Sequence, residues 1–177
     1  NGGDHLTIWL ENNGGLFVRH QDTSNSYTVT TASSLVTENQ WHHLVYTFGS
    51  SGMRLYLDNS LVGTNGGFTG GLSGNPEPII LGSNAWGTGN NQSEPNLLRD
   101  HFDGSIDDLR FYDVALSQAQ VIDVNSEAQG NCLTCSDDDV VLAHWPIDVC
   151  SVDGSAGEIV DIVNGYNGAT LSSVSVD

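Results

Sequence analysis

Short segments in which apolar and polar residues alternate recur along the first part of the chain. The clearest are residues 41–48 and 53–57, which are joined by the turn-forming run Gly49-Ser50-Ser51-Gly52. Alternation with a period of two is typical of a half-buried strand, whereas an amphipathic helix repeats about every 3.6 residues. Such strands bury one face each, so they must pair into sheets that pack together. We therefore expect an all-β structure in which two antiparallel sheets form a sandwich.

The other strands follow from the same pattern. Asn13-Gly14 is a strong hairpin signal between the first two of them. The expected strands are residues 6–10, 16–20, 26–31, 41–48, 53–57, 60–62, 79–82 (short and buried) and 102–112. One short helix is expected near residues 117–123, because Ser117 and Gln120 have the spacing of a capping box.

The sequence after this helix changes in character. Residues 126–139 are polar and include Asp137-Asp138-Asp139, so we expect a linker there. A new strand is expected at 140–147, and 158–163 precedes two Asn-Gly turns. The chain is thus divided into residues 1–125, a linker at 126–139, and a second segment at 140–177.

The charge of the chain is extreme. It has 22 acidic residues, four Lys and Arg together, and a formal net charge of −18 over 177 residues. Such a surface repels phosphates, so neither nucleic acid nor an anionic membrane surface is an expected partner. No apolar run is long enough to predict membrane insertion. The charge is explained either by a solvated, soluble surface or by carboxylates that bind calcium.

Three cysteines lie close together in the sequence. Cys132 and Cys135 form a C-x-x-C pair, and Cys150 follows. A closed zinc site wants four ligands, and no second pair is present. A disulfide is the favoured interpretation, either within the C-x-x-C pair or from one of its members to Cys150.

The sequence does not predict an enzyme. Glycoside hydrolysis needs two positioned carboxylates, and the glutamates of this chain are scattered. They are Glu11, Glu38, Glu77, Glu94, Glu127 and Glu158. The six histidines are also dispersed. His42 and His43 belong to a strand pattern and are expected to be structural.

Three segments in a fixed order resemble a known family. They are Trp41-His42-His43-Leu44-Val45, then Leu55-Tyr56-Leu57-Asp58, then residues 102–113 with the pattern F-x-G-x-I-D-D-L-R-x-Y-D. Together with Ala115-Leu116-Ser117 they resemble laminin-G-like modules, and the resemblance covers residues 5–123. It implies a concanavalin A-like jelly-roll sandwich and an extracellular or cell-surface protein.

The second segment resembles the opening of the same kind of module. Residues 142–148 are similar to the family's first strand, although that strand comes early in the family and late here. Two explanations are open: the chain is an out-of-phase window on a tandem array, or it is a permuted unit. The first-strand segment would then pair with residues 106–112 of its own chain or of a neighbouring copy, through Leu142, Ala143, Trp145 and Ile147. We expect pairing between copies, which would build a filament.

The resemblance also implies candidate binding residues. Asp107 stands at the start of the last strand of the motif, where the family often supports a structural cation, and Asp148 follows the first-strand segment. Calcium is therefore the expected cofactor. The alternative is that Asp108 pairs with Arg110 while Asp107 accepts turn hydrogen bonds.

A sugar site is suggested by Trp86 and Asn84, because an exposed ring beside amides can stack on a sugar face. The same tryptophan could instead plug one end of the sandwich. The leading function is a non-enzymatic extracellular unit whose partners are copies of itself or neighbouring repeats. The alternative is a carbohydrate-binding module of a secreted glycoside hydrolase, with an extracellular glycan as its partner.

Overall fold

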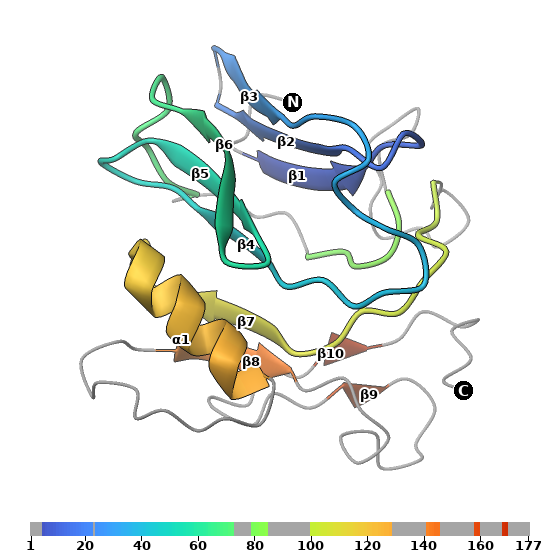
Figure 1. Ribbon diagram of the computed structural model, residues 1–177. Helices are drawn as coiled ribbons and strands as arrows, with labels where there is room; N and C mark the ends of the chain where they lie inside the picture. The colour runs from blue at the N-terminus through green and yellow to red at the C-terminus, as the bar shows by residue number, and fades with distance from the viewer. Residues whose placement is uncertain are drawn as a thin grey trace. The chain divides into compact units, whose positions relative to one another are not determined.

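We describe the protein from a computed structural model (Figure 1). It describes residues 5–22, 24–72, 79–84, 100–128, 141–145, 158–159 and 168–169, with the backbone alone in the last three ranges. The chain divides into two compact units, residues 1–76 with 115–135 and residues 77–114 with 136–177. We describe each unit by itself.

The first unit contains two antiparallel sheets of three strands each. One sheet has the order β1-β2-β3, from β1 (His5–Leu10), β2 (Leu16–Gln21) and β3 (Ser26–Thr30). The other has the order β4-β5-β6, from β4 (Leu44–Thr47), β5 (Met53–Leu57) and β6 (Ser60–Asn65). These sheets confirm the predicted all-β sandwich with one short helix.

The core of the first unit lies between these sheets. Along β2 the buried side chains alternate with partly exposed ones, as the period of two requires. The buried apolar cluster consists of Leu16, Val18, Val29, Met53, Leu55, Leu57 and Phe68. His20 lies in the same interior, stacked on Phe68 with 3.9 Å between ring centroids. Its Nδ1 lies 3.1 Å from the Tyr46 hydroxyl, so this polar ring is hydrogen-bonded within an aromatic cluster.

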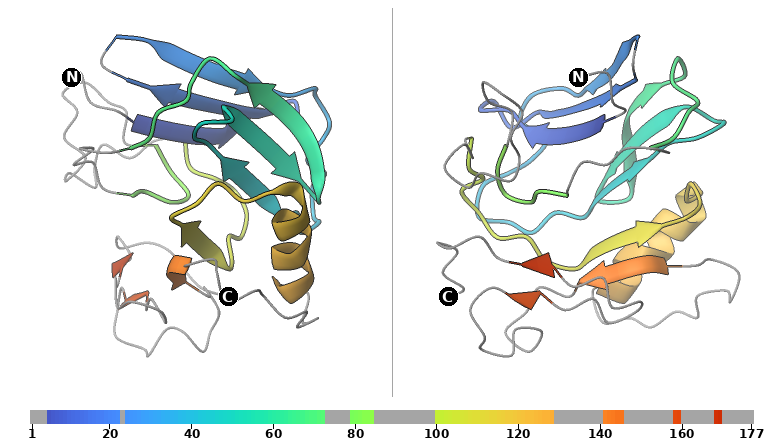
Figure 2. Two further views of the ribbon diagram at one scale, coloured as in Figure 1. Left: turned by 90° about the vertical axis from the view of Figure 1, so that its left-hand side faces the viewer. Right: turned by 180° about the vertical axis from the view of Figure 1, so that it is seen from behind.

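The two sheets come together most closely where β3 lies beside β6 (Figure 2). Gly63 stands at this approach, and an added Cβ would collide with Val29 Cγ1. Asn65 Nδ2 donates to the Thr28 carbonyl at 2.8 Å and ties the same two strands together. A side chain at position 63 would therefore push the sheets apart.

The helix α1 (Gln118–Ala128) begins at the predicted capping box. The Ser117 N–H donates to Gln120 Oε1 at 2.7 Å, and the Gln120 N–H donates to Ser117 Oγ at 3.4 Å. The helix runs past the predicted end at residue 123 and into the predicted linker. No glycine or proline interrupts the sequence before Gly130, and the Asn125 side chain is held by Asn59.

The second unit contains two short antiparallel pairs. β7 (Leu109–Tyr112) pairs with β8 (Val141–Trp145), and β9 (Glu158–Ile159) pairs with β10 (Gly168–Ala169). Among the residues that the structure describes, the β7–β8 sheet has two strands.

Two predicted strands begin later in the structure than expected, a third does not form, and the strand predicted at 60–62 runs on to Asn65 as part of β6. The strand expected at 102–112 begins only at Leu109, because Asp108 has a positive φ of 54° that breaks the extended backbone. The strand expected at 41–48 begins at Leu44, because the His43 N–H donates to a side chain instead of to another strand.

The third error is the buried strand expected at 79–82. The backbone there is irregular, Ile79 and Leu81 are 62% and 42% exposed, and Gly82 has a φ of 70°. An apolar run alone did not decide burial at this position. In the described part of the chain, no helix combines the length and apolar character that a membrane span needs.

Candidate functional site

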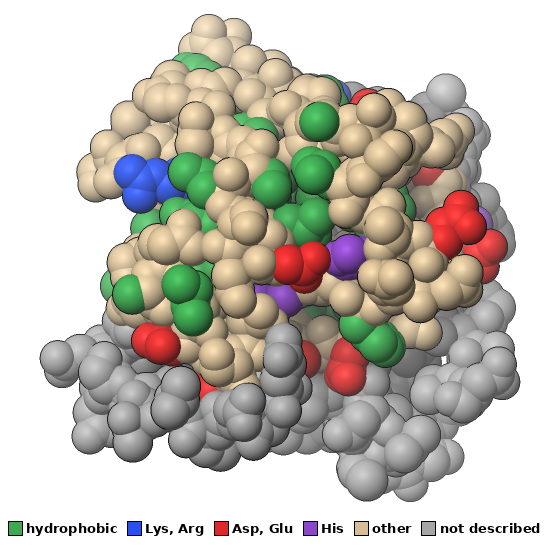
Figure 3. Space-filling view, viewed as in Figure 1, with side chains coloured by type: hydrophobic (Ala, Val, Ile, Leu, Met, Phe, Trp, Pro, Cys, Tyr) green, Lys and Arg blue, Asp and Glu red, His purple; other side chains and the backbone are tan. Residues whose placement is uncertain are grey.

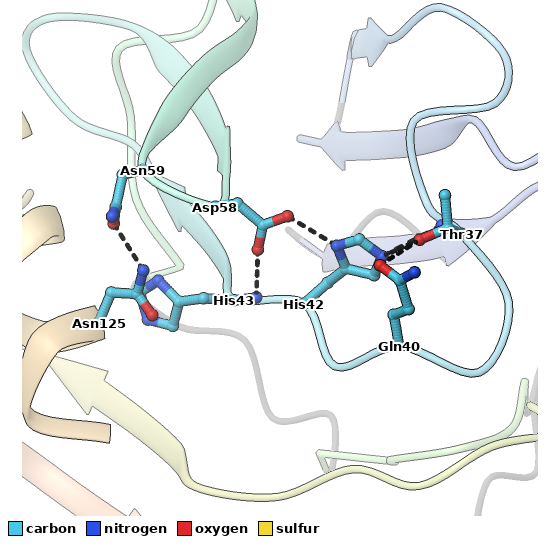
Figure 4. Close-up of polar contacts among 7 residues, drawn as sticks. All are labelled: Thr37, Gln40, His42, His43, Asp58, Asn59 and Asn125. Atoms are coloured by element: carbon cyan, nitrogen blue, oxygen red, sulfur yellow. Dashed lines mark hydrogen bonds and ion pairs between the residues drawn. The ribbon is translucent and has the colours of Figure 1, made fainter. Parts of the chain in front are cut away.

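The densest polar network in the first unit joins two connections between strands. The connection from β3 to β4 supplies Thr37, Gln40, His42 and His43, and the tight turn from β5 to β6 supplies Asp58 (Figure 4). We call these five residues the His42–Asp58 junction. Its partners come from segments that are 15 to 16 residues apart at the closest contacts, so it is a tertiary link rather than a local turn.

The β3–β4 connection is held in place by the hairpin between β1 and β2. The N–H groups of Leu35 and Val36 both donate to the Gly14 carbonyl, at 3.1 and 3.0 Å. Gly14 has a φ of 76°, and an added Cβ would lie 2.9 Å from the Val36 carbonyl oxygen. The Asn-Gly turn predicted from the sequence therefore does more than reverse the chain, because it fixes the segment that leads to Thr37.

The β5–β6 turn presents Asp58 toward this segment. Asp58 and Asn59 have φ values of 47° and 69°, and Leu57 pairs with Ser60 across them. Two central residues with positive φ make the type of two-residue turn that matches the twist of a hairpin, and Asp and Asn tolerate it. The Asp58 N–H donates to the His43 carbonyl at 2.9 Å, which brings the two connections side by side.

The Asp58 carboxylate uses both oxygens within the junction. Oδ1 accepts the His43 N–H at 2.9 Å, and Oδ2 lies 2.7 Å from His42 Nδ1. Partial burial by itself would raise the pKa of Asp58. The hydrogen bonds from the His42 ring and the His43 backbone outweigh that effect and hold the pKa below its usual value.

The second nitrogen of His42 faces Thr37. The Thr37 N–H donates to His42 Nε2 at 3.1 Å, so Nε2 is an acceptor and the ring proton sits on Nδ1, directed at Asp58. The Thr37 hydroxyl oxygen lies 2.9 Å from the same Nε2 and donates to Gln40 Oε1 at 3.1 Å. A hydroxyl, an imidazole and a carboxylate thus stand in a row, with an amide beside the hydroxyl (Figure 4).

The same turn also anchors α1. Gln118 Nε2 donates to the Asn59 carbonyl, and Asn125 Nδ2 donates to Asn59 Oδ1 at 3.0 Å. Sequence reasoning identified His42 and His43 as structural but missed Thr37, Gln40 and Asp58 as their partners. The available signal was an aspartate at the end of the second motif, after a strand predicted to pair with the histidine strand.

The predicted metal residue Asp107 lies in a different setting. Its Oδ1 accepts the N–H of Asp108 at 2.7 Å. Asp108 forms a two-pronged pair with Arg110, with Nε–Oδ1 and Nη2–Oδ2 distances of 3.0 and 3.1 Å. These are the contacts of the alternative interpretation. Among the described residues, no group of three or more His, Cys, Asp or Glu is placed to hold a metal ion.

Several predicted site residues lie outside the described residues. They are Asp148, Trp86, Cys132, Cys135, Cys150 and Ile147. Asn84 is described, and its Nδ2 donates to Asp100 Oδ2 at 3.1 Å. For Leu142, Ala143 and Trp145 the structure gives the backbone, which forms β8.

The register of β8 sets it against the last motif strand. Trp145 pairs with Leu109, His144 with Arg110, and Ala143 with Phe111. The partner strand in this structure belongs to the same chain. Pairing with a neighbouring copy stays a prediction.

On the face shown in Figure 3, acidic side chains are spread widely and basic ones are rare, as the composition requires. Histidine and acidic side chains lie next to one another near the middle of this face.

Comparison with known proteins gives a family and one similar structure. Residues 1–122 match a laminin G family model described as the concanavalin A-like lectin/glucanases superfamily. The crystal structure of residues 221–444 of an S-layer domain-containing protein from Clostridium thermocellum is similar, with 22% identity and a TM-score of 0.42. The match covers 70% of this chain and 64% of that chain, so this chain spans less than two thirds of it. No curated protein matches the chain.

Proposed function

Because the chain belongs to the concanavalin A-like lectin/glucanases superfamily, we propose that it is a non-enzymatic, extracellular laminin-G-like module. Its role is structural or adhesive, and its partners are copies of itself or neighbouring repeats. The joint between copies is strand complementation, in which the segment that forms β8 in one copy pairs with β7 of another.

The pairing of β7 with β8 is the observation that carries this proposal. The joint is made by an antiparallel backbone ladder between strands that are separated in the sequence by α1. A backbone ladder does not distinguish between identical copies, so the same segment of a neighbour can occupy the same place. A head-to-tail contact of this kind does not close on itself and therefore extends into a filament.

The need for a partner strand supports the same view. A two-stranded sheet is at best marginally stable alone, and in the described part of the chain β8 is the strand that pairs with β7. If β8 is withdrawn, β7 is left with unpaired backbone groups along that edge, which invites a replacement strand.

The proposal is tested by sedimentation of the full chain and of a variant that lacks residues 140–177. The full chain should form higher oligomers as its concentration rises, and the deletion should not. The substitution Ala143→Pro removes a backbone N–H from β8 and fixes its φ, and it should weaken assembly. His144→Ala keeps the backbone intact and serves as its matched control. A full chain that stays monodisperse and monomeric at high concentration would contradict the proposal.

We also propose that calcium stabilises the module through Asp107. Calcium prefers six to eight oxygen ligands, and Asp107 contributes a carboxylate beside the start of β7. The other oxygens would come from backbone carbonyls, water and Asp148. Support for this proposal comes from the net charge of −18 and the motif at residues 106–112.

A further inference from the structure

We propose that Thr37 is an internal nucleophile, activated by His42 and Asp58, that forms an ester with the side chain of Gln40. The inference is independent of the proposed assembly, because all four residues belong to the first unit. It describes one self-modification event per chain and requires no turnover of an external substrate.

The geometry of the junction has the three parts that activate a hydroxyl. Thr37 Oγ1 lies 2.9 Å from His42 Nε2, and His42 Nδ1 lies 2.7 Å from Asp58 Oδ2. Both distances are within hydrogen-bond reach, which is the geometric requirement for a nucleophile, its base and the group that orients the base. The carboxylate is itself fixed, because its other oxygen accepts the His43 N–H at 2.9 Å.

The protonation state of the imidazole suits this role. The Thr37 N–H donates to Nε2, which requires a lone pair on that nitrogen. The ring proton is then on Nδ1 and faces Asp58. In this tautomer Nε2 can accept the hydroxyl proton, and the nearby carboxylate stabilises the imidazolium that results.

The acyl donor is already in contact with the nucleophile. Thr37 has one hydroxyl proton, which is donated to Gln40 Oε1 at 3.1 Å. Rotation about the Cβ–Oγ1 bond turns this proton toward His42 Nε2, 2.9 Å away, and leaves Oγ1 beside the carboxamide, whose carbon is bonded to Oε1. A positive φ of 60° at Asn39 turns the chain between Thr37 and Gln40, which brings their side chains together.

The chemical step balances without a co-reactant. The Thr37 hydroxyl proton passes to His42 Nε2 as Oγ1 bonds to Cδ of Gln40. The C–N bond of the carboxamide then breaks, and the leaving nitrogen takes the proton from His42 and departs as ammonia. The product is a Thr37–Gln40 ester that closes the turn. Water can later open the ester and leave a glutamate at position 40.

A slow reaction is sufficient, because each chain reacts once. A positioned general base contributes about 10²–10⁴-fold. Holding two groups in contact replaces a bimolecular encounter with an effective concentration of about 10⁵ M or more when the alignment is good. The junction is at the surface, so ammonia can leave freely.

Intact-protein mass spectrometry of the full chain, followed by fragmentation, tests the proposal. The ester lowers the mass by about 17 Da, the mass of the departing ammonia, and links Thr37 to Gln40 in the fragments. Hydrolysis of the ester instead raises the mass by about 1 Da at Gln40 alone. Either change supports the proposal if it disappears in Thr37→Ala and returns in Thr37→Ser.

Two further variants separate chemistry from folding. Asp58→Asn keeps a side chain that tolerates the positive φ, so the turn is retained while the carboxylate is removed, and the modification should slow at least tenfold. Gln40→Ala removes the acyl donor, so the measured mass of this variant should equal the mass calculated from its own sequence. An unmodified wild-type chain after prolonged incubation at neutral pH would overturn the proposal, as would a mass change that persists in Thr37→Ala.

Discussion

Asp58 and Asp108 both have a positive φ and both stand at turns, yet the carboxylates at these two turns are used differently. At the β5–β6 turn, Asp58 contacts His42 and His43 from another connection, more than a dozen residues away in the sequence. At the start of β7, Asp107 contacts the next residue, and Asp108 contacts Arg110 two residues on. The same carboxylate chemistry therefore makes a tertiary link in one place and a local cap in the other.

The chain has 22 acidic residues, and this difference indicates which of them contribute most to the stability of the fold. A contact between distant segments restricts the conformations of all the residues between them. It must therefore offset a large loss of conformational entropy on folding. A contact over one or two residues orders almost nothing beyond itself. The predictions below separate the two turns, in order of decreasing expected effect.

Asp58→Ala should be the most destabilising of the substitutions considered. It removes two hydrogen bonds of the junction, one of them to an imidazole, and places alanine at a φ of 47°. The expected loss is about 2–3 kcal/mol of unfolding free energy. Urea unfolding measures it, with Asp58→Asn as a milder control that retains an acceptor and the turn. If Asp58→Ala lowers the free energy of unfolding no more than Asp108→Asn does, the proposed difference between the two turns is wrong.

Calcium should stabilise the turn at Asp107, before β7, and should have no effect at the β5–β6 turn that carries Asp58. If Asp107 binds calcium, the ion at ten times its dissociation constant adds about 1.4 kcal/mol of stability. A chelator should then lower the melting temperature of the wild type and have no effect on Asp107→Asn. Equal melting curves for the wild type with and without chelator would refute the site.

Acid should weaken the first turn through Asp58. Because its folded-state pKa is lowered, its stabilisation is fully present above the unfolded value of about 3.9 and is lost as the pH falls through the folded value. The side chain is 51% exposed, so the effect should stay below about 1 kcal/mol. The stability difference between the wild type and Asp58→Asn should shrink as the pH falls below about 5 and on through the lowered pKa of Asp58, and a constant difference would contradict this assignment.

Asp108→Asn should have the smallest effect. The pair with Arg110 is local, and isolated ion pairs near the surface contribute about 0–1 kcal/mol. Asparagine also tolerates the positive φ of 54°. We expect the free energy of unfolding, measured in urea, to change by at most about 0.5 kcal/mol. A loss above about 1 kcal/mol would show that the Asp108–Arg110 pair also stabilises residues outside this turn.

The sequence predicted the sandwich because its signals are local. Alternation, the Asn13-Gly14 turn and the Ser117–Gln120 capping box each depend on a few neighbouring residues, and each is found in the structure. The apolar run at 79–82 was misjudged because a short continuous apolar run does not by itself determine burial. The end of α1 was misjudged because Asn125 is held by Asn59, a contact across 66 residues.

The candidate site was predictable only in part. The two histidines stood out as a motif, but their partners depend on the positive φ of Asp58 and on the anchoring of the β3–β4 connection to Gly14. Neither feature can be derived from spacing alone. The juxtaposition of Thr37 with His42 and Gln40 follows from that anchoring.

The central claim, that β8 can serve a neighbouring copy, is tested most directly by disulfide trapping between β7 and β8. Arg110 and His144 are cross-strand partners, so Arg110→Cys and His144→Cys are placed on two separate chains in which Cys132, Cys135 and Cys150 are replaced by serine. The two chains are mixed and oxidised. We predict a covalent product that contains one copy of each chain, because exchange brings the two positions together between copies. Absence of that product, while a single chain carrying both substitutions closes its own disulfide as a monomer, would show that the strand pairs only within its own chain.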